Sequence, residues 1–461
     1  MTLRTNPISH AITSARAAMG GDGVRSRSLR ATLLTLASVG GSSALRLLSN
    51  LALTRLLFPD AFGLMALVQV FIYGLHMFSD IGINASIIQS NRGEERSFLN
   101  TAWSIQVLRG FLLWLVALSL AYPAVAIYDQ PDLAVLLPVT ALSVLIAGFK
   151  PTRATLANRR LQLGRVVAIE LGAQVVSILI MLLLAWWLRS VMALAIGSVV
   201  SAAVLTLFQF RFLDGERDRF ELTPDAVHEI MTFGVFIFLS TIATFAINMG
   251  GRALLGAHVS AELLGIFSIG LILGSIPETA ALSIAQRVLF PLYRMRPPSA
   301  SRENQRNLFR AHRLVAGFAI GISIIFAYLG VWIVGLLYDD RYLAAGPVVV
   351  LISFALIPGY AVIGSKDALL AKGDSRRHFY LQAVMAVCIL IVTYVGLTQV
   401  GIVGMILAPA VAHLIVYPYR AYLTARYGAW DPVGELGLMG IGLLLTGLAV
   451  WLHRGEIASL L

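Results

Sequence analysis

The chain has 461 residues, of which 58% are hydrophobic and only 13% are charged. Soluble globular domains carry about 25% charged residues, so this composition predicts a protein that is solvated mainly by lipid. The net charge of +11 would favour nucleic acid as a partner in a soluble domain, but basic loops between membrane spans account for it here. A single cysteine, Cys388, excludes an internal disulfide framework, and no cofactor is expected.

The first 30 residues are polar and basic, and they contain no compact apolar segment with a cleavage site. We therefore expect residues 1–30 to form a disordered cytoplasmic tail rather than a signal peptide. Apolar runs then follow one another, each long enough to cross a hydrocarbon layer of about 30 Å as a helix. These spans are expected at 31–55, 62–90, 98–124, 132–157, 163–188, 190–212, 228–254, 262–290, 312–337, 342–371, 378–398, 400–424 and 433–453.

The spans divide into two sets of six and one more, separated in the middle by the longest charged connection. Only Arg189 separates the fifth span from the sixth, which predicts a tight hairpin, and the same holds around Gly401. The expected parts are an N-terminal six-helix lobe at 31–212, a cytoplasmic linker at 213–227, a C-terminal six-helix lobe at 228–424 and an additional transmembrane helix at 433–453.

Short strings of the first half recur about two hundred residues later in the same order. GLMAL at Gly63 recurs as GIFSI at Gly265, SIIQ recurs as SIAQ, and Gly-Phe-Lys ending at Lys150 matches Gly-Ser-Lys ending at Lys366. The recurrence predicts a duplicated bundle. The expected fold is an all-α polytopic membrane protein with two six-helix lobes, related by a pseudo-twofold repeat around a central cavity, plus one extra C-terminal helix.

The distribution of basic residues predicts the orientation. Arginines and lysines gather in the N-terminal tail and in the even-numbered connections, including the run from Arg294 to Arg313. The opposite side holds Arg55, Arg189, Arg252, Arg341 and Arg454. Because cytoplasmic loops of membrane proteins carry the excess of Lys and Arg, we expect a cytoplasmic N-terminus.

Five further cations fall inside the expected spans: Arg46, Arg109, Lys150, Arg287 and Lys366. A cation in hydrocarbon costs between ~3 and ~10 kcal/mol, so such residues generally face a wet or protein-lined interior. One interpretation is a cationic cavity, open to the cytoplasm, that binds an anionic substrate. The alternative is structural: Arg287 and Lys366 snorkel to head groups, Lys150 sits at a kink beside Pro151, and Arg46 and Arg109 form ion pairs.

Asp80, Glu170 and Glu278 are the acids of the expected spans. A carboxyl held in the membrane can bind a proton or a metal cation during transport, or it can be the counter-ion of a nearby cation. Pro277 precedes Glu278 and is expected to break its helix. Asn248, next to a pair of glycines, belongs to the same candidate coupling group.

Several strings resemble the polysaccharide-transport branch of the multidrug/oligosaccharidyl-lipid/polysaccharide exporter superfamily. They are LTRLLFPDAFGLMAL (53–67), SDIGINASIIQ (79–89) and TRATLANRRLQLGRVVAIE (152–170), with LGIFSIGLIL (264–273) and RVLFPLYRM (287–295) in the second half. The resemblance runs from about residue 30 to 425 and is closest to flippases for O-antigen and colanic-acid repeat units.

The resemblance implies a twelve-helix core of two lobes around a central cavity, often with added C-terminal helices. It also implies that cavity Arg and Lys residues hold the pyrophosphate of an undecaprenyl-linked glycan while the lobes rock, driven by an ion gradient or the membrane potential. Relatives often have an Asp where Gly250 stands, after an Asn like Asn248. This departure argues against a cation site in the second lobe.

The resulting hypothesis is a flippase, not an enzyme, for lipid-linked oligosaccharide repeat units in a bacterial cytoplasmic membrane. Its expected partners are the lipid-linked substrate, membrane lipids, a polysaccharide polymerase and export machinery. The alternatives are a cation-coupled multidrug antiporter of the same superfamily, a membrane glycan polymerase or ligase, and a lipid II flippase. No Gly-x-x-x-x-Gly-Lys-[Ser/Thr] loop is present, which argues against an ATP-driven pump.

Overall fold

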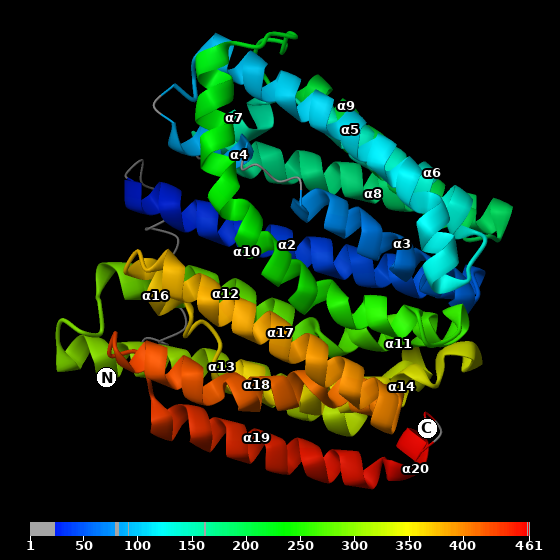
Figure 1. Cartoon of the computed structure of the whole chain (residues 1–461), viewed down its shortest axis with the longest axis vertical. Helices are drawn as coiled ribbons and strands as arrows, with labels where there is room; N and C mark the ends of the chain where they lie inside the picture. The colour runs from blue at the N-terminus through cyan, green and yellow to red at the C-terminus, as the bar shows by residue number, and fades with distance from the viewer. Residues whose placement is uncertain (1–23, 79–82, 91, 161–162, 459, 461) are drawn as a thin grey trace, which may run out of the picture. The chain divides into compact units, whose positions relative to one another are not determined.

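The computed structural model describes residues 24–78, 83–90, 92–160, 163–458 and 460, and these residues are helical almost throughout (Figure 1). The first half contains α2 (Val24–Leu56), α3 (Pro59–Phe78), α4 (Ile83–Gln89), α5 (Arg96–Tyr128), α6 (Leu133–Gly148), α7 (Arg153–Arg159), α8 (Leu163–Leu188) and α9 (Met192–Phe212). The middle contains α10 (Pro224–Gly256), α11 (Ala261–Gly274), α12 (Ile276–Met295), α13 (Arg302–Leu337) and the 3₁₀ turn η1 (Asp340–Tyr342). The last part contains α14 (Ala345–Ala355), α15 (Ile357–Ala361), α16 (Asp367–Ala371), α17 (Ser375–Val400), α18 (Ile402–Ala425), α19 (Pro432–Leu452) and α20 (Arg454–Ala458).

The prediction of an all-α membrane protein is confirmed. Within the described part of the chain, nine helices are long and apolar enough to cross a membrane, and the bent pair of α11 and α12 makes a tenth. The expected spans at 31–55 and 228–254 coincide with α2 and α10, some of whose side chains lie outside the description. Residues 1–23 of the expected tail also lie outside it, whereas Val24 already begins α2.

The expectation of continuous spans was wrong at 132–157 and at 342–371. The span expected at 132–157 is divided between α6 and α7, and the span expected at 62–90 contains α3 and α4, with residues 79–82 between them outside the description. The break expected beside Pro277 is confirmed: the span at 262–290 bends by 43° between α11 and α12, and Pro277 lies in the first turn of α12. The span at 342–371 is divided into η1, α14, α15 and α16.

Proline and glycine explain these breaks, which hydropathy alone does not reveal. Proline lacks a backbone N–H and its ring clashes with the preceding turn, and Pro151 lies three residues after the end of α6. Gly364, between α15 and α16, has φ of +71°, a backbone conformation that glycine adopts without strain.

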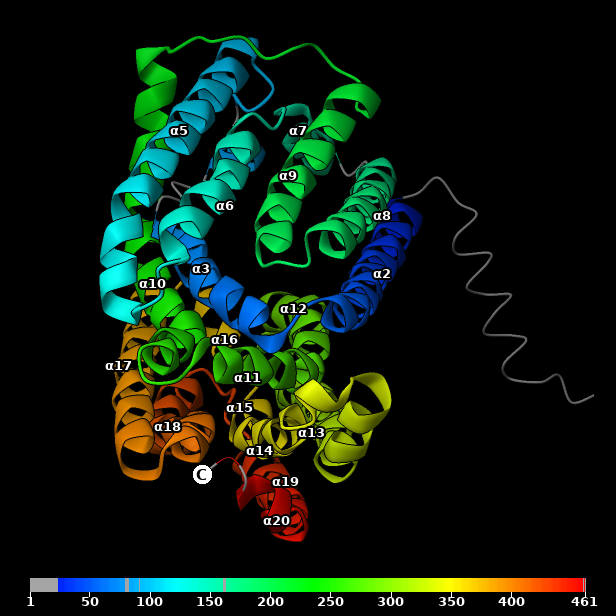
Figure 2. The ribbon, with the colours of Figure 1, turned by 90° about the vertical axis from the view of Figure 1, so that its right-hand side faces the viewer.

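Both predicted hairpins are present. The chain reverses between α8 and α9 at Arg189, which adopts φ of +45°, and Figure 2 shows the two helices side by side. A second reversal joins α17 to α18 at Gly401, with φ of +74°. In this hairpin, Gly396 and Gly404 face each other so closely that a Cβ on either one would overlap the other's carbonyl group.

The described chain forms two compact units. The first contains residues up to 53, 80–118 and 138–235, and the second contains 54–79, 119–137 and 236–461. These units divide the chain differently from the expected lobes, because α3 and the end of α5 belong to the second unit. The lobe boundaries therefore stay a prediction.

In the first unit, side-chain hydrogen bonds hold the charged connection between α9 and α10 (residues 213–223) against neighbouring helices. The Asn100 side chain, on α5, donates its Nδ2 proton to Glu221 Oε2 at 2.7 Å, and the Glu221 backbone N–H donates to Ser104 Oγ at 2.9 Å. The Thr152 backbone N–H donates to Asp218 Oδ2 at 3.1 Å. Side-chain hydrogen bonds thus hold the connection on α5 and on the start of α7.

In the second unit, α3 and α11 cross with their backbones in contact at two glycines. A Cβ on Gly63 would overlap the carbonyl oxygen of Ala261, and a Cβ on Gly265 would overlap the carbonyl oxygen of Pro59. Such close approach is possible only without side chains, as in other small-residue helix contacts in membranes. The two glycines are the ones that head the repeated strings of the sequence.

Candidate functional site

The first unit holds three of the five predicted cations. Arg46 lies on α2 and is exposed, and Arg109 lies on α5 and is half-buried. Lys150 lies in the break between α6 and α7, and its ammonium group is within electrostatic range of the Glu170 carboxylate of α8.

The second unit holds Lys366, which lies in the break between α15 and α16. The Glu278 carboxyl, in the first turn of α12, is within electrostatic range of the Lys366 ammonium. Lys150 and Lys366 are therefore placed alike: each follows a break after an apolar helix, precedes a short helix, and lies near one predicted acid. The echo between their sequence strings is matched by local structure.

The structure gives less information on three other predicted residues, Asn248, Arg287 and Asp80. Asn248, on α10, is exposed, and its Nδ2 lies 3.4 Å from the Tyr73 hydroxyl of α3, to which it donates. Arg287 belongs to α12, but its side chain is outside what the structure describes, and Asp80 lies outside the described residues.

Sequence reasoning missed a buried polar group in the second unit. Arg420 on α18 is only 7% exposed and Glu435 on α19 only 2%. The Arg420 guanidinium is within electrostatic range of Glu435, of Asp367 on α16 and of Lys366. Arg420 looked like an ordinary cytoplasmic topology residue, because it lies near the end of its span and nothing in the sequence shows which helices cover it.

A second missed feature fixes the last long helix. Asp431 caps the N-terminus of α19 by accepting from the Gly434 backbone N–H at 3.1 Å. It also receives two hydrogen bonds from Arg313 of α13, at 2.6 and 2.7 Å. A bidentate arginine–carboxylate pair is among the stronger polar contacts in proteins, so α19 is firmly attached to α13.

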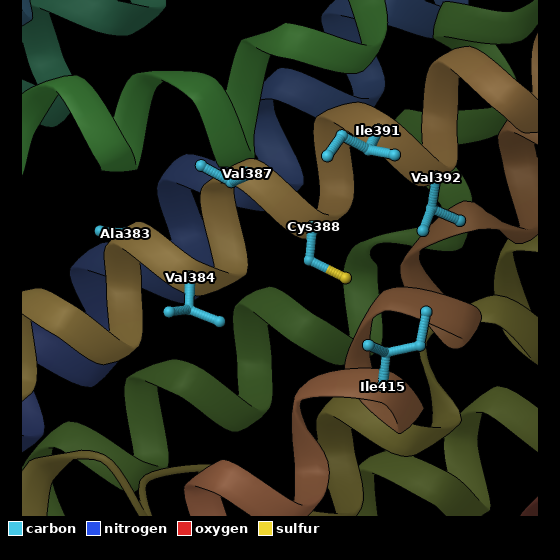
Figure 3. A pocket seen from close by; sticks show the side chains of 7 residues that line it. All are labelled: Ala383, Val384, Val387, Cys388, Ile391, Val392 and Ile415. Carbon is cyan, nitrogen blue, oxygen red and sulfur yellow. The ribbon is translucent and has the colours of Figure 1, made fainter.

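An apolar pocket lies along α17, beside α18 (Figure 3). It has a volume of about 510 Å³, and six residues of α17 and one of α18 line it. They are Ala383, Val384, Val387, Cys388, Ile391, Val392 and Ile415. None of the candidate cations lines it, so it is not the predicted anion site. Among the described residues, no group of three or more His, Cys, Asp or Glu side chains is placed to hold a metal ion.

Comparison with known proteins identifies the family. The model of a family described as "Polysaccharide biosynthesis protein" matches residues 52–347, which is more than half of the chain. The chain belongs to this family. A curated relative, the teichuronic acid biosynthesis protein TuaB of Bacillus subtilis (strain 168), is 25% identical over 309 residues. That match covers 65% of this chain and 62% of the relative's own length.

Solved structures identify the fold. The chain is similar to lipid II flippase MurJ in an inward closed conformation, with a TM-score of 0.68 at 11% identity over 92% of this chain and 99% of that one. It is also similar to the Vibrio cholerae MATE transporter VcmN, with a TM-score of 0.57 at 15% identity over 90% and 97%. A third similar structure is a multidrug resistance MATE transporter of the MOP superfamily, with a TM-score of 0.52 at 15% identity over 89% and 96%.

Family and fold together confirm the resemblance seen in the sequence. The chain is a multi-pass membrane protein of the polysaccharide biosynthesis family, and it has the fold of the solved MOP-superfamily structures.

Proposed function

We propose that this protein is a flippase that moves undecaprenyl-pyrophosphate-linked oligosaccharide repeat units across a bacterial cytoplasmic membrane. The units would supply exopolysaccharide, capsule or O-antigen synthesis, and transport would proceed by alternating access. The N-terminus would lie in the cytoplasm, as the basic connections predict.

One observation carries the proposal: a chain of the polysaccharide biosynthesis family has the fold of MOP transporters. A membrane transporter that serves polysaccharide synthesis needs a cargo that is made on one side of the membrane and used on the other. Lipid-linked sugars fit this need. TuaB is named for teichuronic acid biosynthesis and MurJ for flipping lipid II, and both names agree with a polymer precursor as cargo.

The physical demands of that cargo agree with the residues found. A sugar chain with a pyrophosphate is long, polar and anionic, so it requires a hydrated path with fixed cations. We assign phosphate binding to Arg46, Arg109, Lys150, Arg287 and Lys366. We assign ion coupling or charge compensation to Asp80, Glu170, Glu278 and Asn248.

The proposed architecture is two six-helix lobes related by a pseudo-twofold repeat around a central cavity, with α19 added outside the core. Two observations support the duplication. The reciprocal contact of Gly63 and Gly265 joins the two copies of one string, and Lys150 and Lys366 occupy matching breaks.

The direct test is a strain in which the gene is deleted. Lipid-linked oligosaccharide is expected to accumulate on the cytoplasmic side, and surface polysaccharide to be lost, as measured by mass spectrometry of extracted lipid and by surface labelling. The Arg46→Gln and Arg109→Gln variants are expected to insert into the membrane but not to restore export, because each removes a fixed cation.

Arg310→Gln is the matched control, since Arg310 is exposed on α13 and export should be retained. Normal export by both the Arg46 and the Arg109 variant would refute the cationic cavity. A deletion strain that accumulates no lipid-linked oligosaccharide would refute the flippase itself.

A further inference from the structure

The connection between α9 and α10 (residues 213–223) follows α5 as an extended chain. Three of its backbone N–H groups, at alternate positions, donate to side chains of α5. The pairs are Arg219 with Asn100 Oδ1 at 3.1 Å, Glu221 with Ser104 Oγ at 2.9 Å, and Thr223 with Thr101 Oγ1 at 3.1 Å. Successive residues of an extended chain face opposite sides, so the two residues between these three turn their backbone groups away from α5.

Those two residues, Phe220 and Leu222, carry exposed apolar side chains. Phe220 is 59% exposed and Leu222 is 49% exposed. Single exposed apolar residues are ordinary on a protein surface, but here two of them occupy the same side of a short charged segment. Phe212, the last residue of α9, is also exposed where the connection begins. The outer side of the connection is therefore partly apolar.

The acids and the arginines of the connection differ in their partners. Each of the four acids is bonded to the first unit: Asp214 to Arg165 at 3.2 Å, Glu216 to Arg96 at 2.9 Å, Asp218 to the Thr152 backbone N–H at 3.1 Å, and Glu221 to Asn100 at 2.7 Å. Arg217 and Arg219 are exposed, and neither guanidinium forms an ion pair with an acid in the described part of the chain. The groups left without a protein partner are thus two cations and two apolar side chains, a combination that an anionic lipid surface attracts.

The place of the connection on α5 puts it at the edge of the lipid-facing surface. The helix α5 is long and apolar enough to cross a membrane. Its exposed large apolar side chains begin at Leu108 and continue through Phe111 and Leu112. Ser104, to which the connection is bonded, comes four residues before Leu108, which is about 6 Å along the helix. The connection therefore lies at the depth of the lipid head groups, just outside the hydrocarbon.

We propose that the connection between α9 and α10 docks on the membrane surface. Phe220 and Leu222 lie at the boundary between head groups and acyl chains, where their side chains leave water. Arg217 and Arg219 lie beside anionic lipid head groups, which attract them. The acids, which that surface would repel, are bonded to protein instead.

The docking is shallow, because the backbone N–H groups of Phe220 and Leu222 need water or lipid oxygens as acceptors. The ligand is bilayer lipid rather than cargo, so the docking does not depend on the proposed function.

The test uses the full-length protein with Cys388 replaced by serine, so that one added cysteine carries the fluorophore NBD. Phe220→Cys and Leu222→Cys are labelled separately and reconstituted into nanodiscs of phosphatidylcholine and phosphatidylglycerol. Both labels are expected to emit at shorter wavelength than NBD in water. A nitroxide on the lipid head group should quench both labels strongly, whereas iodide in the water phase should quench them weakly, because lipid shields the labels.

Ser299→Cys is the matched control for the label. Ser299 is exposed and lies just before α13 (Arg302–Leu337). This helix has 36 residues, which corresponds to about 54 Å, whereas a bilayer with its head groups is about 40–45 Å thick. Ser299 is therefore expected to lie in water, where iodide should quench the label several-fold more strongly than at Phe220→Cys.

The role of the two arginines is tested in the same labelled protein. Adding Arg217→Gln and Arg219→Gln together should increase iodide quenching at Phe220→Cys several-fold, and nanodiscs of phosphatidylcholine alone should have the same effect when both arginines are present. Arg294→Gln with Arg296→Gln removes the same charge from another exposed site and should leave the quenching unchanged. The lipid comparison needs no arginine substitution, so it decides the question even if the double variant does not fold.

Three results would overturn the proposal. Equal iodide quenching at Phe220→Cys and Ser299→Cys would show that the connection is free in water. Protection of Phe220→Cys from both iodide and the lipid nitroxide would show that protein, either a second copy or another partner, covers it. Identical quenching with and without phosphatidylglycerol would show that the arginines do not select anionic lipid. The flippase is tested independently by lipid-linked oligosaccharide in the deletion strain.

Discussion

At the scale of single residues, two glycines carry the clearest structural meaning. Gly63 and Gly265 head the repeated strings, and each meets the backbone of the helix on which the other lies. The interval between Gly63 and Gly265 equals that between Pro59 and Ala261, the two residues they contact. The contact is therefore reciprocal. The glycine of each copy of the string meets the residue that lies four positions before the glycine in the other copy.

Replacement of Gly63 by alanine should destabilise the protein. The added methyl group would overlap the carbonyl oxygen of Ala261, so α3 and α11 would have to separate. Overpacking of this kind costs about 1–3 kcal/mol, and we expect a lower midpoint of thermal unfolding for Gly63→Ala and equally for Gly265→Ala. The measurement is a melting curve of each purified variant in the same detergent.

Gly437→Ala provides the control for that experiment. Gly437 lies within α19, and a Cβ there would meet no atom within 4 Å. Alanine is favoured over glycine in a helix by about 1 kcal/mol, so this variant should unfold at the wild-type temperature or above. Unfolding of Gly63→Ala at the same temperature as Gly437→Ala would show that the crossing is not tight.

The predicted site residues have a local sequence pattern that marks them, whereas the missed ones do not. Lys150 and Lys366 stand out because each is a cation within an apolar run. Arg420 lies close to a span end, where arginines are ordinary, yet it is only 7% exposed and lies within electrostatic range of Glu435 on α19 and Asp367 on α16. Tertiary packing of this kind leaves no local pattern, so sequence reasoning found part of the polar group and missed its most buried cation.

At the scale of elements, hydropathy predicted where helices lie but not where they break. The reversals at Arg189 and Gly401 were predicted because polarity or a lone glycine interrupts the apolar run there. A kink at Lys150 and Pro151 was considered only as one interpretation, and the expected span was continued to residue 157 although residues 150–153 interrupt the apolar run. Backbone conformation determines where these helices break. A hydropathy scale describes only the transfer of side chains into lipid, so it does not predict such breaks.

The start of α17 allows a prediction of pH dependence. Asp374 caps this helix by accepting from the Arg377 backbone N–H at 3.0 Å. The Tyr427 hydroxyl donates to the Asp374 carboxylate, and this bond, aided by Arg377, lowers the pKa of Asp374. The folded state therefore favours the ionised carboxyl. Its stabilisation is complete above the unfolded pKa of about 3.9 and is lost as the pH falls through the lower folded value.

Asp374→Ala should accordingly cost about 1 kcal/mol at pH 7, the usual loss for an N-cap, and the difference from wild type should narrow below about pH 4. Thermal unfolding of both proteins from pH 7 to pH 3 measures this. Asp374→Asn retains a capping side chain without the charge and should lose less than alanine. A difference between alanine and wild type that stays constant across this range would contradict a role for the ionised carboxyl.

At the scale of the whole molecule, family and fold were predicted correctly from the sequence, while the division of the chain was not tested. The two compact units interleave along the chain, because α3 and the end of α5 group with the second half. A linear reading of spans assigns each helix to the half in which it occurs. It cannot anticipate the close α3–α11 crossing, which requires residues about two hundred positions apart to touch.

Orientation in the membrane is the molecular property that the charge distribution predicts most directly. With Cys388 replaced by serine, single cysteines can be placed at exposed positions in two connections. Ser190 lies in the α8–α9 hairpin and Ser299 in the connection between α12 and α13. Because the Ser299 connection is rich in arginine and the hairpin is not, a membrane-impermeant maleimide added to intact cells should label Ser190→Cys but not Ser299→Cys. A permeant maleimide should label both, which confirms that each cysteine is reactive. Labelling of Ser299→Cys alone by the impermeant reagent would invert the orientation, and it would place the proposed phosphate-binding lysines nearer the outer face.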